Sequence, residues 1–153
     1  MKLVIQRVSR AEVRVAEEVV GRIGPGLLVL VGLERGDGEG EVERAARRVA
    51  SLRVFEDDEG KINLDLCQVQ GSVLAVSQFT LGASITRGRR PSFDRAMPAT
   101  EAEPLFERFV TGLKALGVEV RTGRFGAIMD VELVNSGPVT LLWDDPPRGA
   151  KPA

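Results

Sequence analysis

The chain contains no histidine and no tyrosine among its 153 residues. Without histidine, a Ser-His-Asp triad, a Cys-His dyad and a histidine general base are all impossible. The same absence removes every metal site that needs an imidazole ligand, and one cysteine cannot supply a Cys₄ zinc site. No GxGxxG or Walker spacing occurs either. We therefore expect no metal and no cofactor, and any catalysis must use carboxylates, hydroxyls, Lys or Arg, backbone dipoles or the substrate's own groups.

Cysteine is represented by Cys67 alone, so no intrachain disulfide is possible. This scarcity fits a reducing compartment. Charges at Lys2, Arg7 and Arg10 interrupt the N-terminal stretch, which lacks the apolar core of a signal peptide. No stretch approaches the ~20 apolar residues of a membrane span. The sequence thus predicts a cytoplasmic protein without a membrane partner.

An excess of positive charge is also missing, because 21 Lys and Arg residues are balanced by 22 Asp and Glu residues. Proteins that grip long stretches of nucleic acid are usually basic. Any contact with RNA should therefore be local and modest, and we expect no DNA partner.

The length of the chain fits one domain. Apolar residues at helical spacing predict helices over residues 40–52 and from about residue 100 to Gly117, where Thr100 and Glu103 resemble a capping box. Strands are predicted over residues 2–10, 12–16, 19–23, 27–33, 72–79, 118–121, 128–134 and 139–143, with a hairpin over 54–63 that turns at acidic residues 57–59. The prediction is one α/β domain over residues 1–144, with mixed, largely antiparallel β-sheets and two main helices, and a flexible tail over 145–153.

A first segment that could carry chemistry is Ser77-Gln78-Phe79-Thr80-Leu81, where a buried strand ends and the long irregular stretch 82–98 begins. Ligand sites lie outside strand ends of this kind. Backbone N–H groups that leave the sheet there can form an oxyanion hole. From the residues alone, an ordinary strand end with a satisfied amide and a buried phenylalanine is the favoured interpretation.

A second segment, residues 135–140, reads Asn-Ser-Gly-Pro-Val-Thr. Such residues between two strands normally form a tight turn, and the residues alone favour that interpretation. The alternative is a cis Gly137-Pro138 bond, which would point two consecutive carbonyls in nearly the same direction. Two such carbonyls would form a rigid acceptor pair for an ammonium group.

Two loops could contact nucleic acid. Arg87, Arg89 and Arg90 form the densest positive run, and their guanidinium groups could reach phosphates or simply be solvated. In residues 122–127, glycines beside Phe125 suit a flat base that approaches the backbone. A simple loop between strands explains that segment nearly as well.

Taken together, these segments resemble the D-aminoacyl-tRNA deacylase (D-tyrosyl-tRNA deacylase) family. The SQFTL segment at 77–81 and the NxGPxT pattern at 135–140 are the family's two characteristic motifs, and the similarity runs from Ile5-Gln6-Arg7-Val8 to about Trp143. Further matching segments, in the expected order, are residues 24–28, 52–55, 88–93 and 122–126.

The resemblance implies hydrolysis of the ester between a D-amino acid and tRNA, which is chiral proofreading in translation. It implies a homodimer with active sites at the subunit interface, where a cis Gly137-Pro138 unit enters the partner's pocket and its carbonyls capture the substrate's α-amino group. Because such a pocket only excludes L side chains, glycyl-tRNA should also be cleaved.

The resemblance also implies roles for individual residues. Arg7 would brace the Gly-Pro segment, and Arg87, Arg89 and Arg90 would contact tRNA phosphates. The residues implied to line the ester site are Ser77, Gln78, Phe79 and Thr80, and those implied to bind the terminal adenosine or other parts of the substrate are Phe125, Gly126, Ala127, Met129 and Asn135.

Our hypothesis for the mechanism places the oxyanion against backbone N–H groups near Gln78 and Phe79. The neighbouring ribose 2′-OH, or a water that it positions, would assist the attack. A Thr80 nucleophile is the alternative, although nothing nearby in sequence would activate it. Two other functions stay open: a non-catalytic tRNA-binding module, and a hydrolase of small esters with a threonine nucleophile.

Overall fold

The computed structural model describes residues 1–145. The tail predicted over 145–153 therefore lies outside the described residues, apart from Asp145. Within the described part, no helix is long and apolar enough to cross a membrane.

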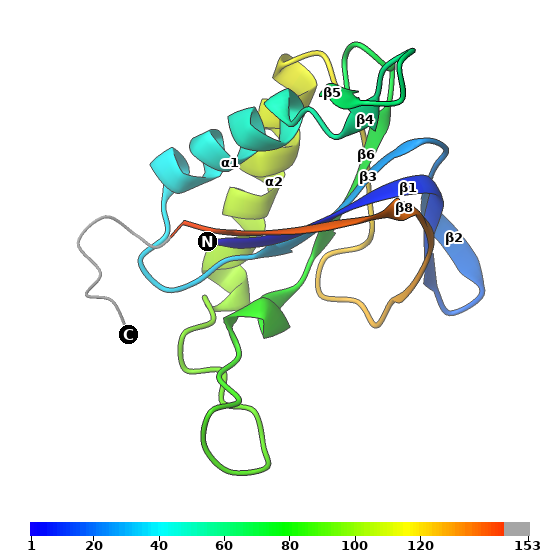
Figure 1. The fold of residues 1–153 in the computed structure, drawn as a ribbon. Helices are drawn as coiled ribbons and strands as arrows, with labels where there is room; N and C mark the ends of the chain where they lie inside the picture. The colour runs from blue at the N-terminus through cyan, green and yellow to red at the C-terminus, as the bar shows by residue number, and fades with distance from the viewer. Residues whose placement is uncertain (146–153) are drawn as a thin grey trace.

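The described residues form a six-stranded mixed sheet, a two-stranded hairpin and two α-helices that lie together on one face of the sheet (Figure 1). This confirms the mixed α/β domain with two helices that the sequence predicts. The strands are β1 (Lys2–Val15), β2 (Glu18–Ile23), β3 (Gly26–Gly32), β4 (Phe55–Glu56), β5 (Ile62–Leu64), β6 (Ser72–Ser77), β7 (Glu119–Thr122) and β8 (Asp130–Asp144). The helices are α1 (Glu39–Ser51) and α2 (Ala99–Ala115), with a short 3₁₀ helix η1 (Phe79–Gly82) after β6.

The sheet has an antiparallel part and a parallel part. Strand β1 pairs antiparallel with β2, β3 and β8, whereas β3 pairs parallel with β6 and β6 pairs parallel with β7. Strands β4 and β5 form the separate hairpin. Parallel neighbours end at the same edge of a sheet, so the segments that follow β6 and β7 leave the sheet close together.

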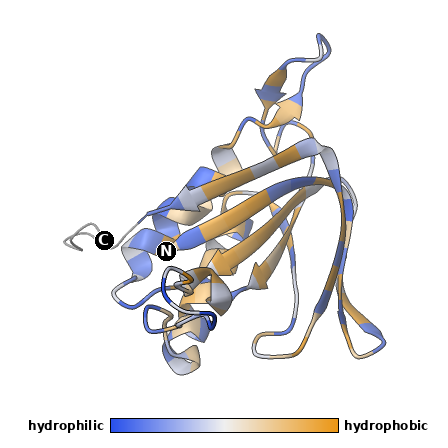
Figure 2. Cartoon of the chain, turned by 60° about the horizontal axis from the view of Figure 1, so that its bottom comes forward, coloured by the Kyte–Doolittle hydropathy of each residue, from blue (hydrophilic) through white to orange (hydrophobic). Residues whose placement is uncertain are grey.

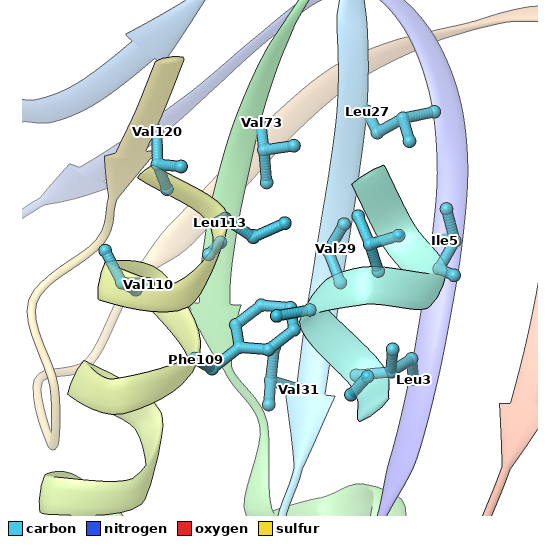
Figure 3. Close-up of a cluster of buried hydrophobic side chains, with 14 of the residues drawn as sticks. Leu3, Ile5, Leu27, Val29, Val31, Val73, Phe109, Val110, Leu113 and Val120 are labelled. Atoms are coloured by element: carbon cyan, nitrogen blue, oxygen red, sulfur yellow. The ribbon is translucent and has the colours of Figure 1, made fainter. Parts of the chain in front are cut away.

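The main core lies between the sheet and the helices (Figure 3). Helix α1 contributes Val42, Ala45, Ala46 and Val49, whose spacing is that of one helical face. Leu27, Val29 and Val31 of β3 also belong to this core, where Phe109 and Leu113 of α2 pack (Figure 3). Trp143, on β8, is partly buried against the same core.

A second core lies on the other face of the sheet. Leu28 of β3 belongs to it, and Leu30 packs against it, so the apolar run of β3 is buried on both faces as the sequence predicts. The sheet curls around this core until β2 meets β7, where Gly21 faces the carbonyl of Thr122. Figure 2 shows hydrophobic residues concentrated on the strands and hydrophilic residues on many of the connecting loops.

Several local predictions are wrong. The strands predicted over residues 2–10 and 12–16 are one continuous strand, β1. Residues 128–134 and 139–143 do not form separate strands but one strand, β8, because β1 is long enough to pair from Lys2 opposite Asp144 to Arg14 opposite Asp130. Thr100 does not cap α2 either. The helix begins at Ala99, because the Pro98 carbonyl already accepts the N–H groups of residues 101 and 102.

The contact between β2 and β7 gives a test of the curled sheet. In Gly21→Ala, the new Cβ would overlap the Thr122 carbonyl oxygen, which belongs to rigid backbone. We expect a loss of about 1–3 kcal/mol in the free energy of unfolding, as for other overpacked sites. Urea unfolding followed by circular dichroism measures this loss.

The matched control for this prediction is Gly40→Ala in α1, where the nearest atom to the new Cβ is an Arg44 guanidinium nitrogen at 3.6 Å. Its stability should stay the same or rise by up to about 1 kcal/mol. Equal stability of the Gly21→Ala variant and the unmodified chain would contradict the described contact.

Candidate functional site

A cavity of about 500 Å³ opens at the carboxyl end of β6. Its walls come from three places: the end of β6 with η1, the start of α2, and the loop between β7 and β8 with the first residues of β8. The lining residues that the sequence predicts are Ser77, Gln78, Phe79, Phe125, Gly126, Ala127 and Met129. The cavity thus brings together two motifs that are almost 50 residues apart in the chain.

The other residues that line the cavity were not predicted from the sequence. They are Leu33, Val76, Met97, Ala99, Ala102 and Val131. All are apolar, and all except Met97 belong to ordinary strand or helix patterns, so only the fold reveals that they face a cavity. The one sequence feature that could have pointed to any of them is the position of Met97 and Ala99 on either side of a proline at the start of a helix.

Strand β6 ends earlier than predicted, at Ser77 instead of Phe79. The Gln78 N–H donates to the Val31 carbonyl at 2.8 Å, and the chain then turns at once into η1. Gly32 permits this turn, because a Cβ there would lie 2.6 Å from the Cβ of Leu81. The Gln78 N–H is therefore occupied and cannot serve as the oxyanion donor that we hypothesised. The N–H groups at the start of η1, those of Phe79 and Thr80, have no carbonyl partner within that helix.

The side chains of this segment differ in their surroundings. The Gln78 amide Nε2 donates to Thr80 Oγ1 at 2.5 Å, and Thr80 is exposed outside the lining of the cavity. Phe79 is not the buried ring that the residues alone favoured, because 57% of it is exposed. Its ring lines the cavity and also packs at a tilt against Phe93, with 5.3 Å between ring centroids.

The opposite wall is the loop between β7 and β8. Phe125 packs at a tilt against Phe106 of α2, with 6.0 Å between ring centroids. Gly123 lets the Met129 sulfur approach the backbone, since a Cβ would lie 2.5 Å from it. Gly126 has a φ of +74°, which favours glycine in the turn. The wall therefore consists of an aromatic ring, a thioether and bare backbone.

The NxGPxT motif forms a bulge within β8 instead of a turn between strands. Val8 of β1 lies opposite Asn135 and Gln6 lies opposite Thr140, so four residues of β8 stand against one residue of β1. The Asn135 side chain closes the bulge: its Oδ1 accepts the N–H of residue 139 at 3.0 Å, and its Nδ2 donates to Thr140 Oγ1 at 2.8 Å. The Gly137-Pro138 bond is cis, as the resemblance implies.

The β1 residue opposite the bulge is Arg7, which is only 8% exposed. Its Nε donates to the Ser136 carbonyl at 2.9 Å, and its Nη1 donates to the Val54 carbonyl at 2.7 Å. Its Nη2 lies 3.7 Å from the Glu56 carboxylate. The contact between Arg7 and the Gly-Pro segment that the resemblance implies is therefore present, and it ties the bulge to the start of β4.

The single chain does not bring all the predicted residues together. Arg7, Asn135, Gly137 and Pro138 are not among the residues that line the cavity. Gly137 and Pro138 are exposed. One chain thus presents a cavity and a projecting bulge as separate features.

Arg87, Arg89 and Arg90 are exposed on a loop that projects beyond η1 (Figure 1). The stretch 82–98 is less irregular than predicted, because Ser84 and Ser92 exchange two backbone hydrogen bonds of 2.8 and 2.9 Å. We call residues 84–92 the arginine hairpin.

The base of the arginine hairpin is tied to the segment that follows β3. The Arg35 N–H donates to the Arg95 carbonyl at 2.8 Å, and the Met97 N–H donates to the Leu33 carbonyl at 3.1 Å. The Arg95 guanidinium lies 3.2 Å from the buried Glu34 carboxylate. The hairpin therefore projects from a fixed base.

The acidic residues 57–59 lie in the β4–β5 turn, as predicted. The Asp57 carboxylate accepts the N–H groups of Lys61 and Glu59 and the Nδ2 group of Asn63, and these hydrogen bonds, led by that from Lys61, lower the pKa of Asp57. This carboxylate therefore stabilises a turn. Among residues 1–145, no group of three or more Cys, Asp or Glu side chains is arranged to hold a metal ion.

Comparison with known proteins places this geometry in a family. The model of the family described as D-Tyr-tRNA(Tyr) deacylase matches residues 4–144. A D-aminoacyl-tRNA deacylase of Symbiobacterium thermophilum is 58% identical over 144 residues, which cover 94% of this chain and 95% of that protein. A D-aminoacyl-tRNA deacylase of Geobacter sulfurreducens is 51% identical over 150 residues, which cover 98% of this chain and 99% of that protein.

Solved structures share the fold. That of the c-Myc DNA Unwinding Element Binding Protein matches with a TM-score of 0.90 and 39% identity, over 95% of this chain and 99% of that one. A probable eukaryotic D-amino acid tRNA deacylase matches with a TM-score of 0.81 at 19% identity, over 94% of this chain and 98% of that one, and so supports the fold alone. With a family model and close relatives that each span nearly all of its length, the chain belongs to the D-Tyr-tRNA(Tyr) deacylase family.

Proposed function

We infer that this chain hydrolyses the ester bond that joins a D-amino acid to the 3′-terminal ribose of tRNA. One observation carries the inference. In a chain that is 58% identical to a D-aminoacyl-tRNA deacylase, the SQFTL segment and the loop between β7 and β8 form two of the walls of one cavity. The products are free tRNA and the D-amino acid.

The cavity suits the terminal adenosine and its ester. The adenine packs against Phe125 and Met129, where Gly126 and Ala127 let the base approach the backbone. The ester then lies beside Ser77 and η1. The N–H groups that begin η1 stabilise the oxyanion, and the loss of one such donor typically costs about 10²–10³ in rate.

Selection for D-amino acids requires a second copy of the chain. Strand β8 pairs with β1 along one edge, and β8 exposes Leu142 at 81% and Val134 at 41%. A long exposed edge with apolar side chains is suited to pairing with another chain. In the proposed homodimer, the bulge of one copy enters the cavity of the other, and the carbonyls of Gly137 and Pro138 bind the substrate's α-amino group. An L side chain would collide with the bulge, whereas D-aminoacyl and glycyl groups fit.

Gly137→Ala tests the role of the bulge. Gly137 has a φ of +120°, and a Cβ there would overlap the guanidinium of buried Arg7. The bulge must then shift, and a displacement of ~1 Å can cost about 10² in rate. We expect kcat/KM for D-aminoacyl-tRNA to fall by about that factor.

The matched control is Gly60→Ala, at a φ of +74° in the β4–β5 turn, where nothing lies within 4 Å of the new Cβ. It should lose stability but retain the rate of deacylation. A Gly137→Ala enzyme with full activity, or an unmodified enzyme that sediments as a fully active monomer, would contradict the proposed role.

Thr80→Ala distinguishes hydroxyl nucleophilicity from assistance by the substrate. Thr80 Oγ1 accepts a hydrogen bond from Gln78, and an amide cannot act as its general base. Because we assign assistance to the ribose 2′-OH, the variant should keep deacylation within about ten-fold, as expected when no catalytic group is lost. Single-turnover deacylation measures this rate. Abolished turnover with intact tRNA binding would instead support a threonine nucleophile.

The arginine hairpin is proposed to bind tRNA phosphates. Replacing Arg87, Arg89 and Arg90 by alanine should weaken tRNA binding and reduce the slope of log K against log salt by up to about 3, because each phosphate contact contributes about one. D-over-L selectivity should survive. Filter binding across a salt series tests this, with exposed Lys61→Ala as the control. An unchanged slope would leave the hairpin with a structural role only.

A further inference from the structure

Two aromatic rings are exposed side by side where the cavity meets the arginine hairpin. Phe79 lines the cavity and is 57% exposed, whereas Phe93 lies outside the cavity lining and is 39% exposed. Their ring centroids are 5.3 Å apart and their planes are inclined by 56°. A single exposed apolar residue is ordinary, but two large rings exposed side by side form a contiguous apolar surface of the kind found at binding sites. The pair therefore extends an aromatic surface from the cavity to the hairpin.

Phe93 is held firmly in this position. It follows Ser92, which is paired through its backbone with Ser84, and its own carbonyl accepts the Ala96 N–H at 2.9 Å. Gly82 lies against Ala96, where a Cβ would be 3.3 Å from the Ala96 backbone. Because the chain is fixed on both sides of Phe93, this ring is a preformed surface.

The chemistry around Phe93 favours single-stranded nucleic acid. Exposed aromatic rings stack with unpaired bases, and nearby cationic groups neutralise the phosphates that link those bases. Here Arg89 and Arg90 belong to the arginine hairpin, and Phe93 directly follows its last residue. An apolar peptide or the acyl chain of a lipid carries no charge that the guanidinium groups could bind.

We propose that Phe93 is the stacking platform for the nucleotide that precedes the terminal adenosine of tRNA. The inference rests on the proposed function, which assigns the terminal adenosine to the cavity. In this arrangement, the base that precedes the terminal adenosine in the tRNA lies outside the cavity, beyond Phe79. Phe93 is the exposed ring next to Phe79. The arginine hairpin then meets the phosphates of the single-stranded 3′ end.

The test compares two substrates in Phe93→Ala. One is full D-aminoacyl-tRNA, and the other is 3′-(D-aminoacyl)adenosine, which has no preceding nucleotide. For the tRNA, KM should rise about 5- to 150-fold with little change in kcat, as expected from the loss of one stacked base. The adenosine ester should be hydrolysed at the unmodified rate. Phe93→Trp should restore the KM for tRNA, whereas Phe93→Leu should not.

Ile62→Ala, at a 58% exposed apolar residue of β5 outside the arginine hairpin, is the matched control and should leave both substrates unaffected. A second measurement uses tRNA with an abasic nucleotide before the terminal adenosine. Its KM should already be raised with the unmodified enzyme, and Phe93→Ala should raise it no further.

Equal impairment of both substrates would show that Phe93 only supports Phe79, and would overturn the inference. An unchanged KM for tRNA in Phe93→Ala would also overturn it. Either result leaves the proposed function intact, since the unmodified enzyme still deacylates D-aminoacyl-tRNA. An unmodified enzyme without activity on D-aminoacyl-tRNA would overturn the proposed function, and this inference with it.

Discussion

The antiparallel pairing of β1 with β8 is the interaction on which the rest of the structure depends. It runs nearly the full length of both strands, yet β8 has four residues where β1 has only Arg7. The extra residues must leave the ladder, and the guanidinium left opposite them is buried. A buried charge requires hydrogen-bond partners, and Arg7 finds them in the carbonyls of Ser136 and Val54. One mismatch in strand register thus shapes the bulge and attaches it to the β4 segment.

The parallel half of the sheet, which contains β6 and β7, shapes the cavity. Because β6 and β7 end at the same edge, the SQFTL segment and the loop around Phe125 become two of the walls of one cavity. The cavity and the bulge therefore come from separate halves of the sheet. In the proposed dimer, the cavity of each chain receives the bulge of its partner. A change in the shape of either half of the sheet therefore affects both active sites.

Local sequence patterns correctly predicted the elements whose secondary structure does not depend on which distant segment they contact. The apolar run of β3 and the helical stripe around Val42 and Val49 follow from periodicity alone. The prediction of a tight turn over residues 135–140 was wrong. The composition of this segment indicates only its local preference, whereas its conformation, a bulge within β8, is decided by pairing with distant β1. The predicted end of β6 was wrong for a related reason, because contacts with distant residues decide it. The Gln78 N–H still bonds to the Val31 carbonyl, and Gly32 then leaves room for the chain to turn into η1. Both motifs of the candidate site were visible in the sequence. The apolar cavity wall from α2 was not, since it looks like ordinary core.

The position of Trp143 gives the chain an internal optical reporter. It is the single tryptophan, and the chain contains no tyrosine, so essentially all ultraviolet fluorescence above the weak phenylalanine emission comes from one indole. That indole is partly buried on β8, opposite Leu3 of β1. Its emission therefore reports the environment of one end of the longest strand pair. A spectroscopist can follow solvent exposure at this edge without attaching a dye or introducing a probe residue.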